Sequence, residues 1–434
     1  MITIGLDIGT TTISAVAAEN GRVLESHNTV HAGFLTGRPA WERVQDPAAL
    51  LQTARETIAP LLEKYSVARI GITGQQHGIV YLNDRGEPLS PLYTWQDGRG
   101  NQPLNGSTYA AEATRLTGLP AATGYGLVTH WYNLQKGLVP EGAAVLCTIH
   151  DYIAMVLCGL TRPVTEPSDA QSLGFFDLEA DAFDLAALEK LGIDPGILPT
   201  VVRKHFVGET EGGIPVAVPI GDNPASFLGA TGGEDAVLVN VGTGSQISVH
   251  TPRPTEVPGL EARPYPLGGF LQVGAALCGG KAWALTERFF AQTLYALTGM
   301  EMELYAALDG LVEQTADNGT HPTVDTAFDG TRTDPLRRGS ITGLTEQNFT
   351  PGQLALGVLH GMTDELYDLY FGYLQAGLPE KELLIGSGNG LRKNRHLRHI
   401  TEKTFGMKLT MTDQPEEAAL GAAMYAQRIK EDEQ

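Results

Sequence analysis

The feature that most constrains this chain is a pattern of apolar strand, polar turn and apolar strand that occurs twice. The first copy, Ile2–Ala17, reads ITIGLDIGTTTISAVA, with its turn at Asp7–Thr12. The second copy, Val237–Val249, reads VLVNVGTGSQISV, with Asn240 in the place of the turn's aspartate. β-Branched residues around a glycine-containing turn predict a β-hairpin. The repetition predicts a duplicated fold, in which two similar domains each present a hairpin turn to one cleft.

Both turns offer phosphate-binding chemistry. Backbone N–H groups approach an anion closely where glycine has no side chain, and hydroxyl groups add donors. Asp7, at the end of the incoming strand, is placed to hold a hydrated divalent cation that neutralises phosphate charge. An ordinary hairpin turn is the alternative, since a short motif of this kind also occurs by chance. The candidate phosphate ligands are Gly9, Thr10, Thr11 and Thr12 in the first turn, and Gly242, Thr243, Gly244 and Ser245 in the second.

Length and composition narrow the class of protein. The chain has 434 residues, more than one hydrophobic core normally accommodates, so two domains are expected. A net charge of −20, without a basic run, argues against nucleic-acid binding. Three scattered cysteines, Cys147, Cys158 and Cys278, are expected to be buried thiols rather than a disulfide framework or a zinc site. The most apolar window, Ala143–Leu160, is too short and polar to span a bilayer, and no signal peptide is recognised, so we expect a cytoplasmic protein without a membrane partner.

Two polar clusters follow short strands in the first quarter of the chain. Gly74–Gly78 reads GQQHG and Trp95–Arg99 reads WQDGR. Amide, imidazole, carboxylate and indole groups together suit a polyol, because a polar pocket discriminates sharply among hydroxylated ligands. For each cluster alone the plainer alternative is a core histidine with satisfied hydrogen bonds, or an Asp-Gly turn.

Asp222 is the candidate catalytic base. An apolar strand, Val216–Ile220, leads to the sequence GDNPAS, in which Asn223 is expected to cap a helix that begins at Pro224. Asp222 would then lie just outside the helix N-terminus, whose partial positive charge favours the ionised carboxylate that a base requires. A weakly basic carboxylate is sufficient for phosphoryl transfer, because the transition state is largely dissociative. A capping role without chemistry is the alternative.

The second half offers one more candidate site. A strand at Glu382–Ile385 runs into a glycine-rich turn whose glycines allow a base or ribose to approach the backbone. The turn residues are Gly386, Ser387, Gly388 and Asn389. Lys281, at a helix start, either faces phosphate or is solvated. The Pro-rich stretch Thr251–Pro266 is expected to be a surface loop. A last helix from Pro415 carries small residues that permit close backbone packing and is expected to belong to the core.

Together these motifs resemble the FGGY family of carbohydrate kinases, within the actin-like ATPase superfamily. The two hairpins are similar to the superfamily's phosphate loops, GQQHG and TWQDGR to the family's sugar motifs, and GDNPAS to the segment that carries its catalytic aspartate. The resemblance implies an α/β fold of two actin-like, ribonuclease H-like domains with a nucleotide and sugar cleft between them. Residues 1–231 would carry the sugar site, the first hairpin and the catalytic aspartate. Residues 232–434 would carry the second hairpin and the adenosine site, at the glycine-rich turn.

The same resemblance implies the cofactors and the roles of single residues. ATP would be the phosphoryl donor, with Mg²⁺ held through water by Asp7, and Asp222 would be the base and a substrate contact. The other sugar-contact candidates are Gln76, His77, Trp95 and Asp97, with Arg99 orienting Asp97. The chain departs from the family at Gln76, where methionine is more common, and at His360, where an acidic residue is expected.

Further motifs narrow the substrate. TWQDGR, TGYG (Thr123–Gly126), TIHDY (Thr148–Tyr152) and MVLCGLTRP (Met155–Pro163) resemble the branch of the family that phosphorylates sedoheptulose, whereas generic members usually have KDY in place of IHDY. The implied reaction is transfer of the γ-phosphoryl group to a primary hydroxyl of a ketose, the 7-hydroxyl of sedoheptulose in the nearest match. A xylulokinase, or another ketose or polyol kinase, is the nearest alternative. A non-catalytic actin-fold nucleotide-binding protein is the alternative from a different class, and self-association into a homodimer stays open.

Overall fold

The computed structural model describes residues 1–331, 334 and 336–430, which form two compact units. Unit 1 contains residues 1–233, 263–269 and 414–434, and unit 2 contains residues 234–262 and 270–413. This division differs from the expected single boundary after residue 231. The chain leaves unit 2 and returns to unit 1 twice, and its last segment lies in unit 1.

The central sheet of unit 1 has seven strands in the order β15-β16-β5-β1-β2-β3, with β17 also paired to β5. The first three strands form an antiparallel meander, and β5 pairs with β1 in parallel. Their bounds are β1 Ile2–Ile8, β2 Thr12–Glu19, β3 Arg22–Val30, β5 Val67–Gly74, β15 Phe206–Glu209, β16 Pro215–Ala217 and β17 Ile220–Gly221. The carboxyl ends of β1, β5 and β17 therefore meet at one edge, because all three run in the same direction.

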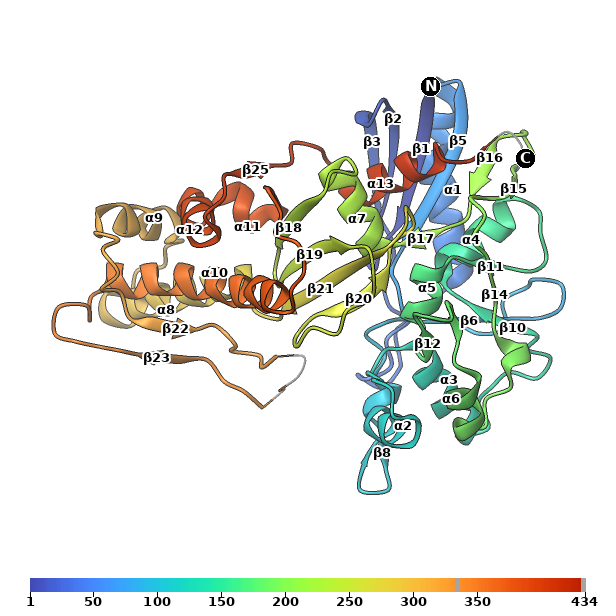
Figure 1. Cartoon of the computed structure of the whole chain (residues 1–434), viewed down its shortest axis with the longest axis horizontal. Helices are drawn as coiled ribbons and strands as arrows, with labels where there is room; N and C mark the ends of the chain where they lie inside the picture. Colours follow the sequence, from blue (N-terminus) through green and yellow to red (C-terminus); the bar gives the residue numbers. More distant parts are fainter. Residues whose placement is uncertain (332–333, 335, 431–434) are drawn as a thin grey trace. The chain divides into compact units, whose positions relative to one another are not determined.

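Helices cover both faces of this sheet. Alternation along β2 places Ala15 and Ala17 against α1 (Pro47–Lys64), and Val16 and Ala18 against α13 (Glu417–Ala426). Figure 1 shows α13, in red, beside β1 and β5, in blue. The last helix begins at Glu417 rather than at Pro415, and it packs on the first strands of the chain, within unit 1.

Glycines allow α13 to approach its neighbours closely. A Cβ atom built on Gly5 of β1 would lie 1.7 Å from the carbonyl oxygen of Ala419, and one on Gly71 of β5 would lie 1.9 Å from that of Ala422. Helix α7 (Asp222–Thr231) meets α13 in the same way, because a Cβ on Gly421 would lie 1.8 Å from the carbonyl oxygen of Ala225. The expected close backbone packing of this helix is confirmed.

A second hydrophobic cluster of unit 1 lies under the sugar motifs. It is built around α2 (Tyr109–Thr117), α3 (Gly126–Gln135) and α6 (Leu185–Leu191), with apolar residues of the short strands β6 (Val80–Leu82) and β7 (Leu92–Tyr93). The remaining helices of this part are α4 Ile149–Leu157 and α5 Pro167–Ser172. Each begins with a side-chain cap, which fixes where the helix starts.

Unit 2 repeats the sheet pattern of unit 1. Its six strands lie in the order β20-β21-β19-β18-β24-β25, with β18, β19 and β21 antiparallel and β24 parallel to β18. The bounds are β18 Ala236–Val241, β19 Ser245–Thr251, β20 Glu261–Pro264, β21 Phe270–Ala276, β24 Leu383–Ser387 and β25 Leu409–Met411. The series β24-β18-β19-β21 thus corresponds to β5-β1-β2-β3, which confirms the predicted duplication.

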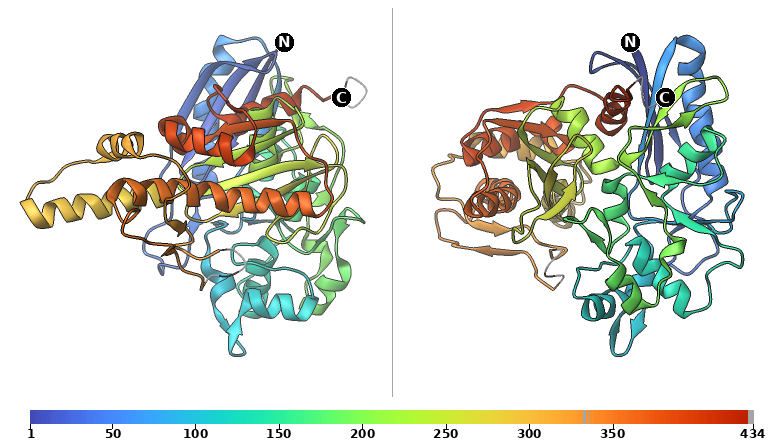
Figure 2. Two further views of the ribbon diagram at one scale, coloured as in Figure 1. Left: turned by 60° about the vertical axis from the view of Figure 1, so that its left-hand side comes forward. Right: turned by 45° about the vertical axis from the view of Figure 1, so that its right-hand side comes forward.

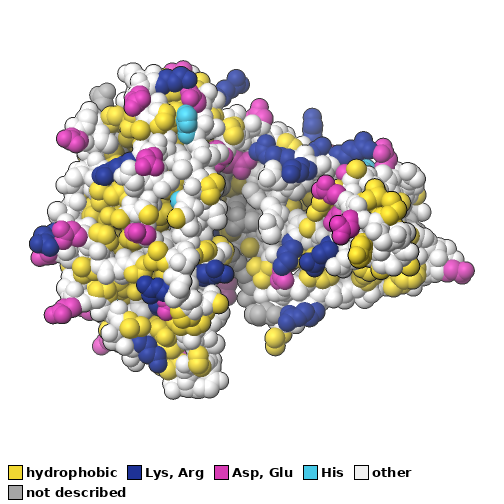
Figure 3. Space-filling model, turned by 180° about the vertical axis from the view of Figure 1, so that it is seen from behind, with side chains coloured by type: hydrophobic (Ala, Val, Ile, Leu, Met, Phe, Trp, Pro, Cys, Tyr) yellow, Lys and Arg dark blue, Asp and Glu magenta, His cyan; other side chains and the backbone are white. Residues whose placement is uncertain are grey.

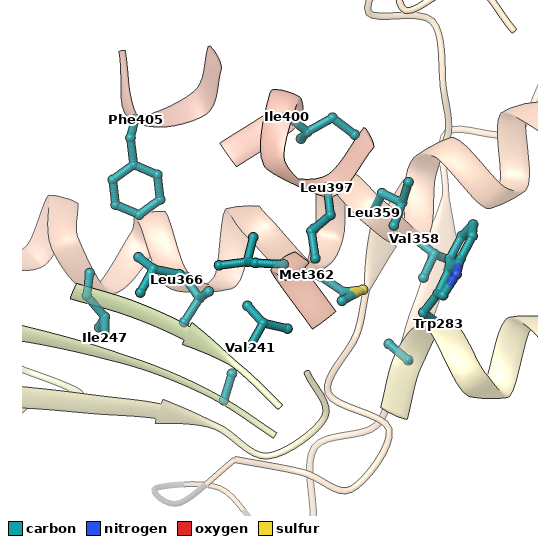
Figure 4. Packing of buried hydrophobic residues seen from close by; sticks show 14 of the residues in the cluster. Val241, Ile247, Trp283, Val358, Leu359, Met362, Leu366, Leu397, Ile400 and Phe405 are labelled. Atoms are coloured by element: carbon teal, nitrogen blue, oxygen red, sulfur yellow. The ribbon is translucent and has the colours of Figure 1, made fainter. Parts of the chain in front are cut away.

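Long helices close the core of unit 2. Helix α10 (Pro351–Gln375) lies along the sheet and beside α8 (Gly280–Thr298), as Figure 2 shows in orange and gold. Met362 and Leu366 of α10 point between Ile400 and Phe405 of α12 and Val241 of the sheet (Figure 4). The other helices are α9 Tyr305–Gln314, α11 Gly388–Lys393 and α12 Arg395–Phe405.

The surface and the thiols agree with a globular protein. On the face in Figure 3, acidic and basic side chains are interspersed among apolar and neutral ones. Cys147 and Cys278 are buried and Cys158 is partly buried, and burial raises the pKa of all three thiols. Within the described ranges, no helix has both the length and the apolar character needed to cross a bilayer.

Candidate active site

The first hairpin turn is braced by the WQDGR segment. The carbonyl oxygen of Thr12 accepts a hydrogen bond of 3.1 Å from the backbone N–H of Gly9. Trp95 Nε1 donates to the Thr10 hydroxyl at 3.0 Å, and this hydroxyl lies 3.4 Å from Gln75 Oε1. Gln45 Nε2 donates to the Thr10 carbonyl at 2.8 Å. The turn is therefore held from both sides.

Asp222 lies within the N-terminus of α7 instead of before it. Gly221, with φ −60° and ψ 152°, caps the helix, Asp222 is its first residue, and the expected cap at Asn223 is wrong. The reason is that the first-turn N–H groups have no intrahelical partners, so Pro224 is tolerated inside this turn as well as at its first position. The backbone N–H groups of Asn223 and Gln76 donate to the Asp222 carboxylate.

The charge on Asp222 is set by opposing effects. Burial raises the pKa of Asp222, and Arg263 and His150 lower it. We expected the helix N-terminus to leave this carboxylate readily ionised, but desolvation outweighs that effect. Burial also raises the pKa of Asp7 to about 7, with the Asp222 and Glu416 carboxylates contributing. Two carboxylates with raised pKa values in one place favour a cation and suit proton transfer.

Gln76 and His77 lie where β5 ends. Gln76 is buried, and its Nε2 donates to the carbonyl oxygen of Ser168 at 2.9 Å. His77, with φ 72°, stacks on Tyr125 at a centroid distance of 4.9 Å. His77 Nδ1 lies 2.6 Å from the carbonyl oxygen of Ser172, and a carbonyl only accepts, so Nδ1 carries the proton. The TGYG segment, which contains Tyr125, therefore fixes the imidazole.

Trp95 and Asp97 have different environments. Trp95 is 45% exposed, and Gly124 packs on its backbone, since a Cβ on Gly124 would lie 1.9 Å from the Trp95 carbonyl oxygen. Asp97 is fully buried and caps the 3₁₀ helix Gly98–Asn101. Its carboxylate accepts from Arg99 Nη1 at 2.6 Å and from the backbone N–H of Arg43 at 3.1 Å. The Arg99 guanidinium lies over the Tyr93 ring at 4.4 Å.

In unit 2, the second hairpin turn lies beside the junction of β24 and α11. The glycine-rich turn expected at Gly386–Asn389 is not a turn, because Gly386 and Ser387 end the strand and Gly388 begins the helix. Strands β18 and β24 are parallel, and Asn240 is paired with Ser387. Asn240 Nδ2 donates to the Ser387 hydroxyl at 2.6 Å. A Cβ on Gly388, whose φ is 84°, would lie 2.5 Å from the Val241 carbonyl oxygen. The residues expected to hold phosphate and adenosine therefore share one sheet edge.

Helix α8 begins against the same turn. The backbone N–H of Gly280 donates to the Gly242 carbonyl at 2.9 Å, and that of Lys281 donates to the Thr243 carbonyl at 3.0 Å. Lys281 Nζ makes an ion pair of 2.6 Å with Asp329, and both side chains are partly exposed. The start of α8 therefore supports the second hairpin turn. The Lys281 side chain is neither free in solvent nor directed to a phosphate here, because it forms an ion pair with Asp329.

The sequence did not predict a role for Arg263 or for a buried polar cluster near Asp222. Arg263 lies in the stretch expected to be a surface loop, but β20 forms there and the side chain is 4% exposed. The cluster contains His150 and Asp169, both fully buried, with His150 Nε2 2.8 Å from Asp169 Oδ2. The TIHDY motif was the only signal for His150, and it marked a resemblance rather than a role.

Comparison with known proteins identifies the family of the chain. The model of the N-terminal domain of the FGGY family of carbohydrate kinases matches residues 2–240, and that of the C-terminal domain matches residues 237–428. A sedoheptulokinase from Mus musculus is 27% identical over 98% of this chain and 96% of its own length. A xylulose kinase from Streptomyces coelicolor is 28% identical over 98% of this chain and 87% of its own.

A solved structure shows the same fold. The xylulose kinase from Rhodospirillum rubrum superimposes with a TM-score of 0.83 at 22% identity, covering all of this chain and 92% of its own. The expected α/β fold of two actin-like domains is confirmed by this likeness and by the repeated sheets of units 1 and 2. Since the two domain models together match residues 2–428, the chain belongs to the FGGY family of carbohydrate kinases, which are sugar phosphotransferases.

Proposed function

We propose that this kinase transfers the γ-phosphoryl group of ATP to the 7-hydroxyl of sedoheptulose, with Asp222 accepting the proton. The observation that carries the proposal is the environment of Asp222, at a helix start beside Gln76, Arg263 and Asp7. A carboxylate held in this way suits a late proton transfer, because the dissociative transition state requires orientation of the hydroxyl more than strong basicity.

The sugar contacts divide into two groups. Gln76, His77 and Trp95 offer an amide, an imidazole and an indole, and the indole is hydrogen-bonded to Thr10 of the first hairpin turn. Asp97 is less available to a sugar, because its carboxylate already accepts hydrogen bonds from the Arg99 side chain and from the backbone N–H groups of Arg99 and Arg43. We therefore assign Asp97 to positioning the WQDGR segment, and the direct contact to Trp95.

The phosphate and metal sites follow from the two turns. Thr10, Thr11 and Thr12 with Gly9 supply donors in unit 1, and Gly242–Ser245 supply them in unit 2. Mg²⁺ fits Asp7 through water, because a cation relieves the repulsion among the acids that raise its pKa. The ion would neutralise phosphate charge during transfer. Gly386, Ser387, Gly388 and Asn389 would receive the adenosine moiety.

Sedoheptulose is preferred over other ketoses because of the motifs around the sugar contacts. In the TGYG segment, Tyr125 stacks on His77 and Gly124 packs on the backbone of Trp95, so the motif that resembles the sedoheptulose branch supports the residues proposed to contact the sugar. Xylulose is the second candidate, favoured by the similarity to a xylulose kinase over most of the chain. A kinase for either sugar would share Asp222 and both hairpins.

A substrate panel tests the proposal. ADP release is measured with sedoheptulose, xylulose, ribulose and glycerol, for the wild type and for Asp222→Asn. We expect the highest kcat/KM with sedoheptulose, and a fall in kcat of about 10²–10⁴-fold in the variant. Turnover with xylulose but not sedoheptulose would replace the substrate, and sugar-dependent turnover within about tenfold of the wild type would refute the role of Asp222 as base.

A further inference from the structure

His150 and Asp169 form a buried pair near Asp222, and neither residue is among the proposed sugar or phosphate ligands. His150 lies in the first turn of α4, and Asp169 lies in α5. Both side chains are completely buried, and His150 Nε2 lies 2.8 Å from Asp169 Oδ2. A pair of ionisable groups removed from water in this way is costly, so its retention calls for a role.

The pair is linked to Asp222 through Gln76. Gln76 Nε2 lies 3.5 Å from Asp169 Oδ1 and donates to the Ser168 carbonyl at 2.9 Å. The Gln76 amide packs on the residue before Asp222, since a Cβ on Gly221 would lie 2.1 Å from its Nε2 atom. The backbone N–H of Gln76 in turn donates to the Asp222 carboxylate.

His150 also holds the strand from which Gln76 extends. A Cβ on Gly74, the last residue of β5, would lie 3.1 Å from His150 Nδ1. The backbone N–H of Gly221 donates to the Ser168 hydroxyl at 3.2 Å, and Ser168 neighbours Asp169 in α5. The imidazole therefore limits how β5 can move relative to α5.

The charges around His150 make the cluster close to neutral. Burial lowers the pKa of His150, raises that of Asp169 well above its usual value, and raises the pKa of Asp151 to about 7 and that of Glu166 to about 8. Asp222 is the remaining acid whose charge acts on His150. A neutral histidine in contact with a neutral acid fixes geometry without adding charge to the site.

We propose that His150 and Asp169 form a positioning pair that acts through Gln76 to hold Asp222 in the geometry that phosphoryl transfer requires. This inference rests on the proposed role of Asp222.

Two substitutions at His150 test the pair. His150→Gln keeps an N–H donor near the position of Nε2, whereas His150→Leu keeps the bulk without the donor. We expect kcat with sugar to fall about 10²-fold in the leucine variant, because misplacement of a reacting group by about 1 Å costs that much. The glutamine variant should stay within about tenfold of the wild type, and KM for ATP should change little in both. Equal kcat values for the two variants would overturn the inference.

A double-mutant cycle covers the case in which His150→Leu does not fold. Asp169→Asn preserves the shape of a protonated aspartate, and Gln76→Met introduces the residue more common in the family. If the pair acts through Gln76, the effects of these two substitutions on kcat are not additive, whereas additive effects would overturn the inference. If the wild type phosphorylates none of the tested sugars, the proposed function itself fails. Sugar-dependent turnover that needs Asp222 but is indifferent to His150 and Asp169 refutes only the positioning pair.

Discussion

Trp95 donates its indole N–H to the hydroxyl of Thr10 across 3.0 Å, so a candidate sugar contact is tied to the turn that we propose binds phosphate. The two residues are 85 positions apart in the sequence. Sugar and phosphate sites that share a hydrogen bond should respond to each other's occupancy.

Removal of this hydrogen bond should affect both sites. Trp95→Phe keeps the aromatic face and loses the donor, and Thr10→Val loses the acceptor. We expect KM for the sugar to rise about two- to tenfold in either variant, which corresponds to the usual net value of one hydrogen bond. The double variant should be no worse than the single ones, and steady-state kinetics with varied sugar and ATP check this. Fully additive effects would show that the bond has no role.

The pH dependence of kcat should depend on Arg263. Burial raises the pKa of Asp222 and Arg263 lowers it, and Asp222 must be ionised to accept a proton. Activity therefore rises with pH through the Asp222 pKa. Arg263→Gln removes the lowering effect, so the acid limb of the pH–rate profile should move to higher pH by about one unit.

Arg69→Gln is the matched control for this shift. Arg69 is an arginine of the same unit whose Nη1 donates to the Gln427 carbonyl at 3.0 Å. We expect its pH–rate profile to coincide with that of the wild type. A limb that stays in place in Arg263→Gln would exclude Arg263 as the counter-charge of Asp222.

Gly388→Ala should weaken ATP binding. Gly388 combines a φ of 84° with a Cβ position 2.5 Å from the Val241 carbonyl oxygen, so alanine must displace the junction of β24 and α11. Gly377→Ala is the control, because Gly377 has a similar φ of 75° with open space around its Cβ position. We expect KM for ATP to rise at least about tenfold in the first variant only, measured at saturating sugar. A similar rise in both would point to backbone strain rather than to the nucleotide site.

Gly421→Ala should destabilise unit 1. The added methyl would lie 1.8 Å from the Ala225 carbonyl oxygen, so α13 and α7 must separate. We expect a loss of about 1–3 kcal/mol in the free energy of unfolding, as for other overpacked cores, measured with urea. Gly310→Ala, in an open position on α9, should be neutral or slightly stabilising because alanine is the better helix former. Equal stability of the two variants would contradict the close packing.

The sequence predicted what depends on local pattern. Both hairpins were recognisable because strand, turn and strand follow within a few residues, and the position of Asp222 followed from a short strand and a proline near a helix start. The exact start of that helix could not be predicted, because Gly221 and Asn223 are both acceptable caps. In the structure Gly221 is the cap, and it is also the last residue of β17, which pairs with β5.

What depends on distant contacts was not predictable. Arg263 lies in a Pro-rich stretch, and only pairing in the sheet and proximity to Asp222 give it a role. The same holds for Asp97, which the motif marked as a sugar contact and which the structure places in a buried ion pair with Arg99. A motif identifies a residue, but the atoms left available to a ligand depend on its neighbours.

The return of α13 to unit 1 has a consequence for biosynthesis. Gly5 and Gly71 leave the ribosome early, and the helix that covers them is among the last segments to emerge. At about 5–20 residues per second, the nascent sheet spends tens of seconds with that apolar side unprotected. A ribosome that stalls before α13 would release a chain whose first strands are formed but whose apolar face is exposed and prone to aggregation. Such truncated chains should depend most on chaperones.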